Sequence, residues 1–91
     1  MAIEQPGITV IDVRTPAEFA EGRLPGAVNI NLQDPGFADA IAALDADADY
    51  AVYCRSGSRS RMAIDVMTQA GVTQTVGLDG GILAWKGAIE R

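Results

Sequence analysis

The single cysteine of this chain is its clearest candidate for chemistry. Cys54 follows an apolar stretch, residues 50–53, and precedes a turn rich in glycine and serine that is expected to open a helix. Backbone N–H groups and the positive end of a helix dipole favour the thiolate, which is the nucleophilic form of cysteine. Arg55, Arg59 and Arg61 place three of the seven basic residues within seven positions of the sulfur. We predict a reactive thiol that handles anions.

Composition limits how this thiol can be activated. The 91 residues include one cysteine and no histidine, which excludes an internal disulfide, a multi-thiolate metal site and a cysteine–histidine dyad. We expect no metal and no cofactor. The net charge is −5 and basic residues gather only beside the cysteine, so we expect no nucleic-acid partner. No apolar stretch approaches the length of a membrane span and the start lacks a basic signal, so we expect a cytoplasmic protein without a membrane partner.

Strands and helices are expected to alternate along one domain. The pattern predicts strands at residues 8–13, 27–32, 50–54 and 75–78, and helices at residues 15–21, 34–44, 58–70 and 82–87. Such alternation indicates an α/β fold with a parallel sheet and right-handed crossovers. Ligand sites of these folds lie beyond the carboxyl ends of the strands. Because Arg14 and Cys54 each close a strand, we expect both at that edge.

Helix boundaries carry recognisable signals. Thr15-Pro16 with Glu18 forms the pattern of a capping box, and Asp34-Pro35 is expected to start the second helix by the same logic. The third helix is expected to end before Gly71 and to place one group of residues on a common side: Met62, Val66, Met67 and Ala70.

Three stretches stand out in this order: Val10-Ile-Asp-Val-Arg14-Thr-Pro-Ala-Glu18-Phe19 running into Gly22-Arg-Leu-Pro25-Gly26-Ala-Val-Asn29-Ile, then Cys54-Arg-Ser-Gly-Ser-Arg59-Ser, and then Leu78-Asp-Gly-Gly81-Ile-Leu-Ala-Trp85. Together they resemble the signatures of the single-domain rhodanese (thiosulfate sulfurtransferase) family. The resemblance covers nearly the whole chain. It implies a rhodanese-like three-layer fold, in which a small central parallel sheet of four to five strands is flanked by helices, over a single domain at residues 1–91.

Two positions depart from the family pattern. Arg23 stands where the family often has histidine, in a turn for which the mechanism requires no catalytic group. Only seven residues precede Ile8, so the N-terminal strand and helix are shortened relative to the family. We expect one open sheet edge, and a monomer or weak homodimer.

The resemblance implies a sulfurtransferase in which Cys54 carries sulfur as a persulfide. The donor would be thiosulfate or a related compound, and the acceptor cyanide, a thiol or a protein. The expected binding residues are those of the loop: Arg55, Ser56, Gly57, Ser58, Arg59 and Ser60. Asp12 and Arg14 are expected either to pair with each other or Glu18 or to order this loop. The small residues of the loop predict an open pocket.

Two other functions remain open at this point. One is a rhodanese-like module that binds a partner protein without catalysis, although the retained Cys54 and arginines argue against it. The other is a phosphatase or arsenate reductase relative. Four residues separate Cys54 from Arg59, whereas phosphatases of the Cys-x5-Arg type need one more, and that position is Ser60.

Overall fold

The computed structural model describes residues 7–78 and 80–91 and contains alternating strands and helices. The strands are β1 (Ile8–Asp12), β2 (Val28–Asn29), β3 (Asp49–Tyr53) and β4 (Thr75–Gly77). The helices are α1 (Pro16–Glu21), α2 (Phe37–Ala42), α3 (Ser58–Gln69) and α4 (Gly81–Ala84). The predicted order of elements is confirmed, although β2 and α4 are shorter than expected.

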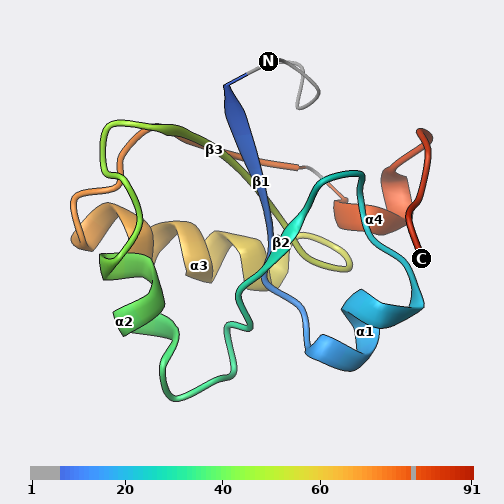
Figure 1. The fold of residues 1–91 in the computed structure, drawn as a ribbon, viewed down its shortest axis with the longest axis horizontal. Coiled ribbons are helices and arrows are strands. Elements are labelled where there is room, and N and C mark those ends of the chain that lie inside the picture. Colours follow the sequence, from blue (N-terminus) through green and yellow to red (C-terminus); the bar gives the residue numbers. More distant parts are fainter. Residues whose placement is uncertain (1–6, 79) are drawn as a thin grey trace.

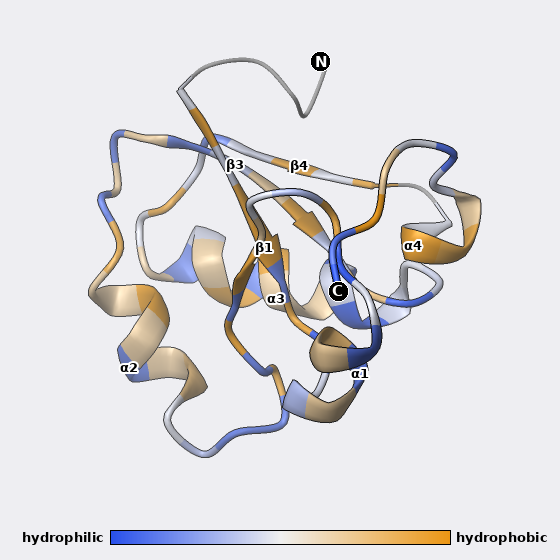
Figure 2. Ribbon diagram, turned by 45° about the vertical axis from the view of Figure 1, so that its right-hand side comes forward, coloured by the Kyte–Doolittle hydropathy of each residue, from blue (hydrophilic) through white to orange (hydrophobic). Residues whose placement is uncertain are grey.

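The four strands form one parallel sheet in the order β2-β1-β3-β4. β1 and β3 lie at the centre and pair from Ile8↔Asp49 to Asp12↔Tyr53. Successive side chains of these strands point to opposite faces, so each strand contributes to two separate apolar clusters. This explains why both strands are nearly continuous in apolar residues, which Figure 2 shows as hydrophobic colour along β1 and β3.

Helices cover both faces of the sheet, which confirms the expected rhodanese-like three-layer α/β architecture. On one face, Ile11, Val13 and Val52 pack with residues of α2 and α3 such as Phe37 and Met67. On the other face, a second cluster includes Val10, Ala51, Tyr53, Leu24, Ile82 and Trp85; Ile82 lies in α4 and Trp85 directly follows it. Figure 1 shows α2 and α3 on one side of the central strands and α1 and α4 on the other.

Local signals explain where two of the helices begin and end. The Thr15 side chain accepts a hydrogen bond from the N–H of Glu18, whose carboxylate in turn accepts one from the N–H of Thr15, so the capping box is confirmed. At the end of α3, the N–H of Val72 bonds to the carbonyl of Met67 at 2.9 Å, and the N–H of Gly71 bonds to that of Thr68 at 3.1 Å. This is a Schellman motif, and it confirms the predicted end of α3.

Two details of the helices were predicted wrongly. Asp34 does not cap α2; its carboxylate accepts from the N–H of Gly36 at 2.7 Å, which makes a turn, and the helix begins at Phe37. Met62 is 61% exposed, because α3 buries the side that carries Ser60, Ala63 and Met67 instead.

The predicted shortening of the N-terminal strand concerns residues 1–6, which lie outside the described residues. Among residues 7–78 and 80–91, β2 and β4 are the edge strands of the sheet. Within those same residues, the structure contains no helix with the length and apolar character needed to cross a membrane.

Candidate active site

The proposed nucleophile lies at the carboxyl edge of the sheet, as its sequence position predicted. Cys54 directly follows β3, and Arg14 follows the neighbouring strand β1 by two residues. The loop from Cys54 to Gly57 leads into α3, whose first turn carries Ser58, Arg59 and Ser60. Cys54 is 1% exposed, and the N–H of Gly57 contacts its sulfur. The open pocket expected from the small loop residues stays a prediction.

Groups of the loop form hydrogen bonds with the sulfur. The N–H of Gly57 donates to Cys54 Sγ at 2.9 Å, and the Cys54 thiol donates to Ser60 Oγ at 3.7 Å. Burial by itself raises the pKa of the Cys54 thiol, but hydrogen bonds from Ser60, Gly57 and Ser56 outweigh it and the net pKa is lowered. Backbone N–H groups of the loop therefore contribute most to stabilising the thiolate.

Gly57 is required by the shape of this loop. Its φ is 115°, a left-handed conformation that glycine adopts without the steric penalty of a side chain. This conformation turns its N–H to Cys54, while its carbonyl accepts from Ser60 Oγ at 2.9 Å and from the N–H of Arg61 at 3.3 Å. The same residue therefore closes the loop around the sulfur and begins α3.

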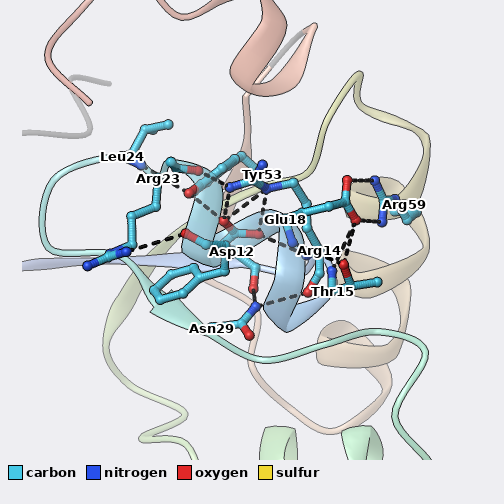
Figure 3. A network of polar contacts seen from close by, with 11 residues as sticks. Asp12, Arg14, Thr15, Glu18, Arg23, Leu24, Asn29, Tyr53 and Arg59 are labelled. Atoms are coloured by element: carbon cyan, nitrogen blue, oxygen red, sulfur yellow. Dashed lines mark hydrogen bonds and ion pairs between the residues drawn. The ribbon is translucent and has the colours of Figure 1, made fainter. Parts of the chain in front are cut away.

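Arg59 is held by an acidic residue from α1. Its Nη1 and Nη2 donate to Glu18 Oε1 and Oε2 at 2.8 and 3.0 Å, the bidentate arrangement visible in Figure 3. The ion pair raises the pKa of Arg59, to which the nearby Cys54 charge also contributes. The alternative in which Glu18 pairs with Asp12 or Arg14 is therefore wrong. The sequence indicated Glu18 as a capping residue and as a partner of Asp12 or Arg14, but not as a partner of Arg59. This contact depends on the first turns of α1 and α3 meeting at the carboxyl edge of the sheet.

Arg55 and the two serines beside it lie on the outer side of the loop. Arg55, Ser56 and Ser58 are exposed, and among the described residues the guanidinium of Arg55 makes no ion pair. Of the two arginines expected to bind an anion, Arg55 is thus open to solvent while Arg59 shares its charge with Glu18.

Asp12 and Arg14 form a buried ion pair with each other. Arg14 Nη2 lies 2.7 Å from Asp12 Oδ2, and also donates to the carbonyl of Gly22 at 2.6 Å. Tyr53 Oη donates to the same Asp12 oxygen at 2.6 Å and accepts from the N–H of Leu24 at 3.1 Å. Figure 3 shows these side chains converging on Asp12.

This network supports the site indirectly. In the described residues neither Asp12 nor Arg14 donates to or accepts from loop residues 55–60; the connection passes through Tyr53, which precedes Cys54 on β3. Tyr53 was not among the predicted site residues, because a tyrosine within an apolar strand is indistinguishable from a core residue. Arg23 lies elsewhere, with its guanidinium over the ring of Phe19 at 4.6 Å.

Comparison with known proteins gives a consistent result. The model of the rhodanese-like domain family matches residues 1–88. A sulfurtransferase of Allochromatium vinosum is 36% identical over 86% of this chain and 71% of its own length. The thiosulfate sulfurtransferase GlpE of Pseudomonas aeruginosa is 36% identical over 92% of this chain and 74% of its own.

A solved structure agrees with the sequence relatives. The rhodanese-related protein from Thermoplasma volcanium superposes with a TM-score of 0.82 at 31% identity, covering 92% of this chain and 84% of that one. The thiolate loop, the parallel sheet that carries it and these similarities together lead to one conclusion: the chain belongs to the rhodanese-like domain family.

Proposed function

We propose that this protein is a sulfurtransferase that moves a sulfane sulfur from thiosulfate, or a related donor, through a persulfide on Cys54. The observation that carries the proposal is the contact of the Gly57 N–H with Cys54 Sγ at 2.9 Å, within a loop that lowers the pKa of the thiol. The sulfurtransferase relatives, among them the P. aeruginosa protein named for thiosulfate, support the same chemistry.

The reaction proceeds in two displacements. The Cys54 thiolate attacks the outer sulfur of thiosulfate; the sulfur–sulfur bond of the donor breaks and sulfite leaves with the bonding electron pair. The new persulfide carries its negative charge on the outer sulfur, where loop N–H groups stabilise it as oxyanion donors would. An acceptor nucleophile, such as cyanide or a thiolate, then takes the outer sulfur and returns Cys54 to the thiolate.

The arginines have different parts in this proposal. Exposed Arg55 attracts the donor to the loop, and the charge of Arg59 contributes through its fixed position beside Glu18. Ser56, Gly57, Ser58 and Ser60 complete the binding loop. Because Glu18 offsets one of the two positive charges, the loop offers less net charge to a dianion than two free arginines would.

Intact mass spectrometry tests the proposal directly. Thiosulfate-treated protein is expected to gain the mass of one sulfur atom, lose it on addition of cyanide, and release thiocyanate. Cys54→Ser is the control and is expected to gain nothing while keeping the fold. Wild-type protein that stays unmodified by thiosulfate and by mercaptopyruvate would refute the proposal.

The same samples separate the remaining functions. Thiosulfate is expected to load Cys54 faster than mercaptopyruvate, and the reverse order would assign a different donor. Turnover of a generic aryl phosphate would instead support the phosphatase alternative, which the loop length disfavours.

A further inference from the structure

Helix α4, which begins at Gly81, contacts the loop that follows Cys54. The N–H of Ile82 donates to the carbonyl of Cys54 at 2.9 Å, and the N–H of Leu83 donates to the carbonyl of Arg55 at 3.2 Å. Both donors belong to the first turn of α4, whose N–H groups have no partner within the helix. These hydrogen bonds from α4 therefore fix the directions of the carbonyl groups of Cys54 and Arg55.

Fixing a carbonyl also fixes the N–H of the same peptide group. A trans peptide is planar, so its N–H points opposite to its C=O. With the carbonyl of Arg55 turned to α4, the N–H of Ser56 points away from α4, and this N–H is one of the donors that lower the pKa of Cys54. The carbonyl of Cys54 likewise directs the N–H of Arg55 away from α4.

Only a glycine at position 81 allows α4 to come this close. Gly81 has a φ of 61°, and a Cβ built on it would overlap the carbonyl oxygens of both Cys54 and Arg55. Gly26 makes a useful contrast, because its φ of 73° is similar but a Cβ there would meet nothing within 4 Å. Position 81 thus requires glycine for two separate reasons: its backbone conformation and its close contact with the loop carbonyls.

We propose that α4 is a positioning element for the nucleophile: Gly81 admits the helix, and the N–H groups of Ile82 and Leu83 hold the two loop peptides so that the N–H of Ser56 faces Cys54. Without these contacts the two carbonyls are free to rotate toward the sulfur, where their negative ends oppose a thiolate or persulfide. The inference rests on the proposed function only in taking Cys54 as the nucleophile. It assigns the last sequence signature a task in the active site rather than in the core alone.

A pair of variants at one position tests the backbone contact. Leu83→Pro removes the N–H that reaches Arg55 within the first helical turn, where proline is tolerated, whereas Leu83→Ala keeps it and trims a side chain that is 67% exposed. The thiol pKa is measured from the rate of iodoacetamide alkylation against pH. We expect Leu83→Ala to match wild type, and Leu83→Pro to raise the thiol pKa by about one unit, which lowers the thiolate fraction about tenfold below that pKa.

A second pair of variants tests the same contact in case Leu83→Pro fails to fold. Gly81→Ala and Gly26→Ala impose similar backbone strain, but only the former overlaps the loop carbonyls. Gly81→Ala is expected to raise the thiol pKa and Gly26→Ala to leave it at the wild-type value. A folded Leu83→Pro with the thiol pKa of Leu83→Ala, or equal thiol pKa values in the two glycine variants, would overturn the inference. Alkylation needs no sulfur donor, so these results stand whether or not thiosulfate loads Cys54.

Discussion

Replacing Glu18 by glutamine isolates the ion pair that fixes Arg59. The amide keeps the length of the side chain and can still accept from the N–H of Thr15, which the carboxylate does at 3.2 Å, so the capping box survives. What is lost is the charge that receives two hydrogen bonds from Arg59, at 2.8 and 3.0 Å. The change in stability of this variant therefore measures what the charge of Glu18 contributes to its contact with Arg59.

The pKa of the carboxyl sets an upper limit for the effect. The hydrogen bonds from Arg59, aided by Thr15 and opposed by burial, lower the pKa of Glu18 from 4.5 to about 2. At 1.36 kcal/mol per unit this corresponds to about 3.4 kcal/mol. Because the side chains of Arg59 and Glu18 are 23% and 27% exposed, solvent screens the pair. We expect Glu18→Gln to lower the free energy of unfolding by about 1 kcal/mol at neutral pH.

The dependence on pH gives this prediction its sign. The pKa of Glu18 is lower in the folded state, so its stabilisation is fully present above pH 4.5 and is lost as the pH falls from 4.5 toward 2. Urea unfolding followed by circular dichroism at pH 7, 5 and 3 is the assay. The difference between wild type and Glu18→Gln is expected to be equal at pH 7 and 5 and smaller at pH 3.

Glu21→Gln is the matched control. Glu21 is an exposed carboxylate on the same helix with no ion pair among the described residues, so its replacement is expected to change the free energy of unfolding by less than about 0.5 kcal/mol. If Glu18→Gln behaves like Glu21→Gln at pH 7, or if its effect is the same at pH 3 as at pH 7, the ion pair does not stabilise the fold as reasoned above.

Three further predictions follow from buried groups. The alkylation rate of Cys54 is expected to rise with pH through a midpoint below the ordinary thiol value of 9.0, because its pKa is lowered, and a midpoint above that value would contradict the loop geometry. Asp12→Asn leaves Arg14, which is 6% exposed, without its counter-charge and is expected to cost about 3–5 kcal/mol in urea unfolding; a cost below about 1 kcal/mol would contradict the role of this pair. Tyr53→Phe removes the hydroxyl that bonds to Asp12 and Leu24, so thermal unfolding is expected to show a loss of about 1–3 kcal/mol with the Cys54 alkylation rate unchanged. A changed alkylation rate would give the Tyr53 hydroxyl a direct part in the site.

Local patterns predicted much of the fold. The capping box at Thr15 and the helix end at Gly71 were both found as expected, because each depends on hydrogen bonds between residues within a few positions of each other. The helix start at Asp34 was wrong for a related reason: a short polar side chain before proline can cap a helix or make a turn, and the neighbouring residues do not distinguish these outcomes.

The orientation of α3 shows a second limit of sequence patterns. Its apolar residues occupy more than one side, so their spacing did not decide which side is buried. The sheet decides it, since Ala63 and Met67 pack into the cluster beneath β1 and β3 while Met62 remains exposed.

The sequence by itself identified the proposed nucleophile and its immediate surroundings. Cys54, Gly57 and Ser60 lie within seven consecutive residues, so a strand end, a glycine turn and a helix start bring their groups close together. The tertiary structure decided which distant groups hold this loop. Glu18 lies 41 positions from Arg59, and the N–H of Leu83 reaches the carbonyl of Arg55. Such contacts leave no periodic signal in the sequence, because they depend on the parallel register of β1, β3 and β4, which places the ends of strands far apart in the chain at one edge.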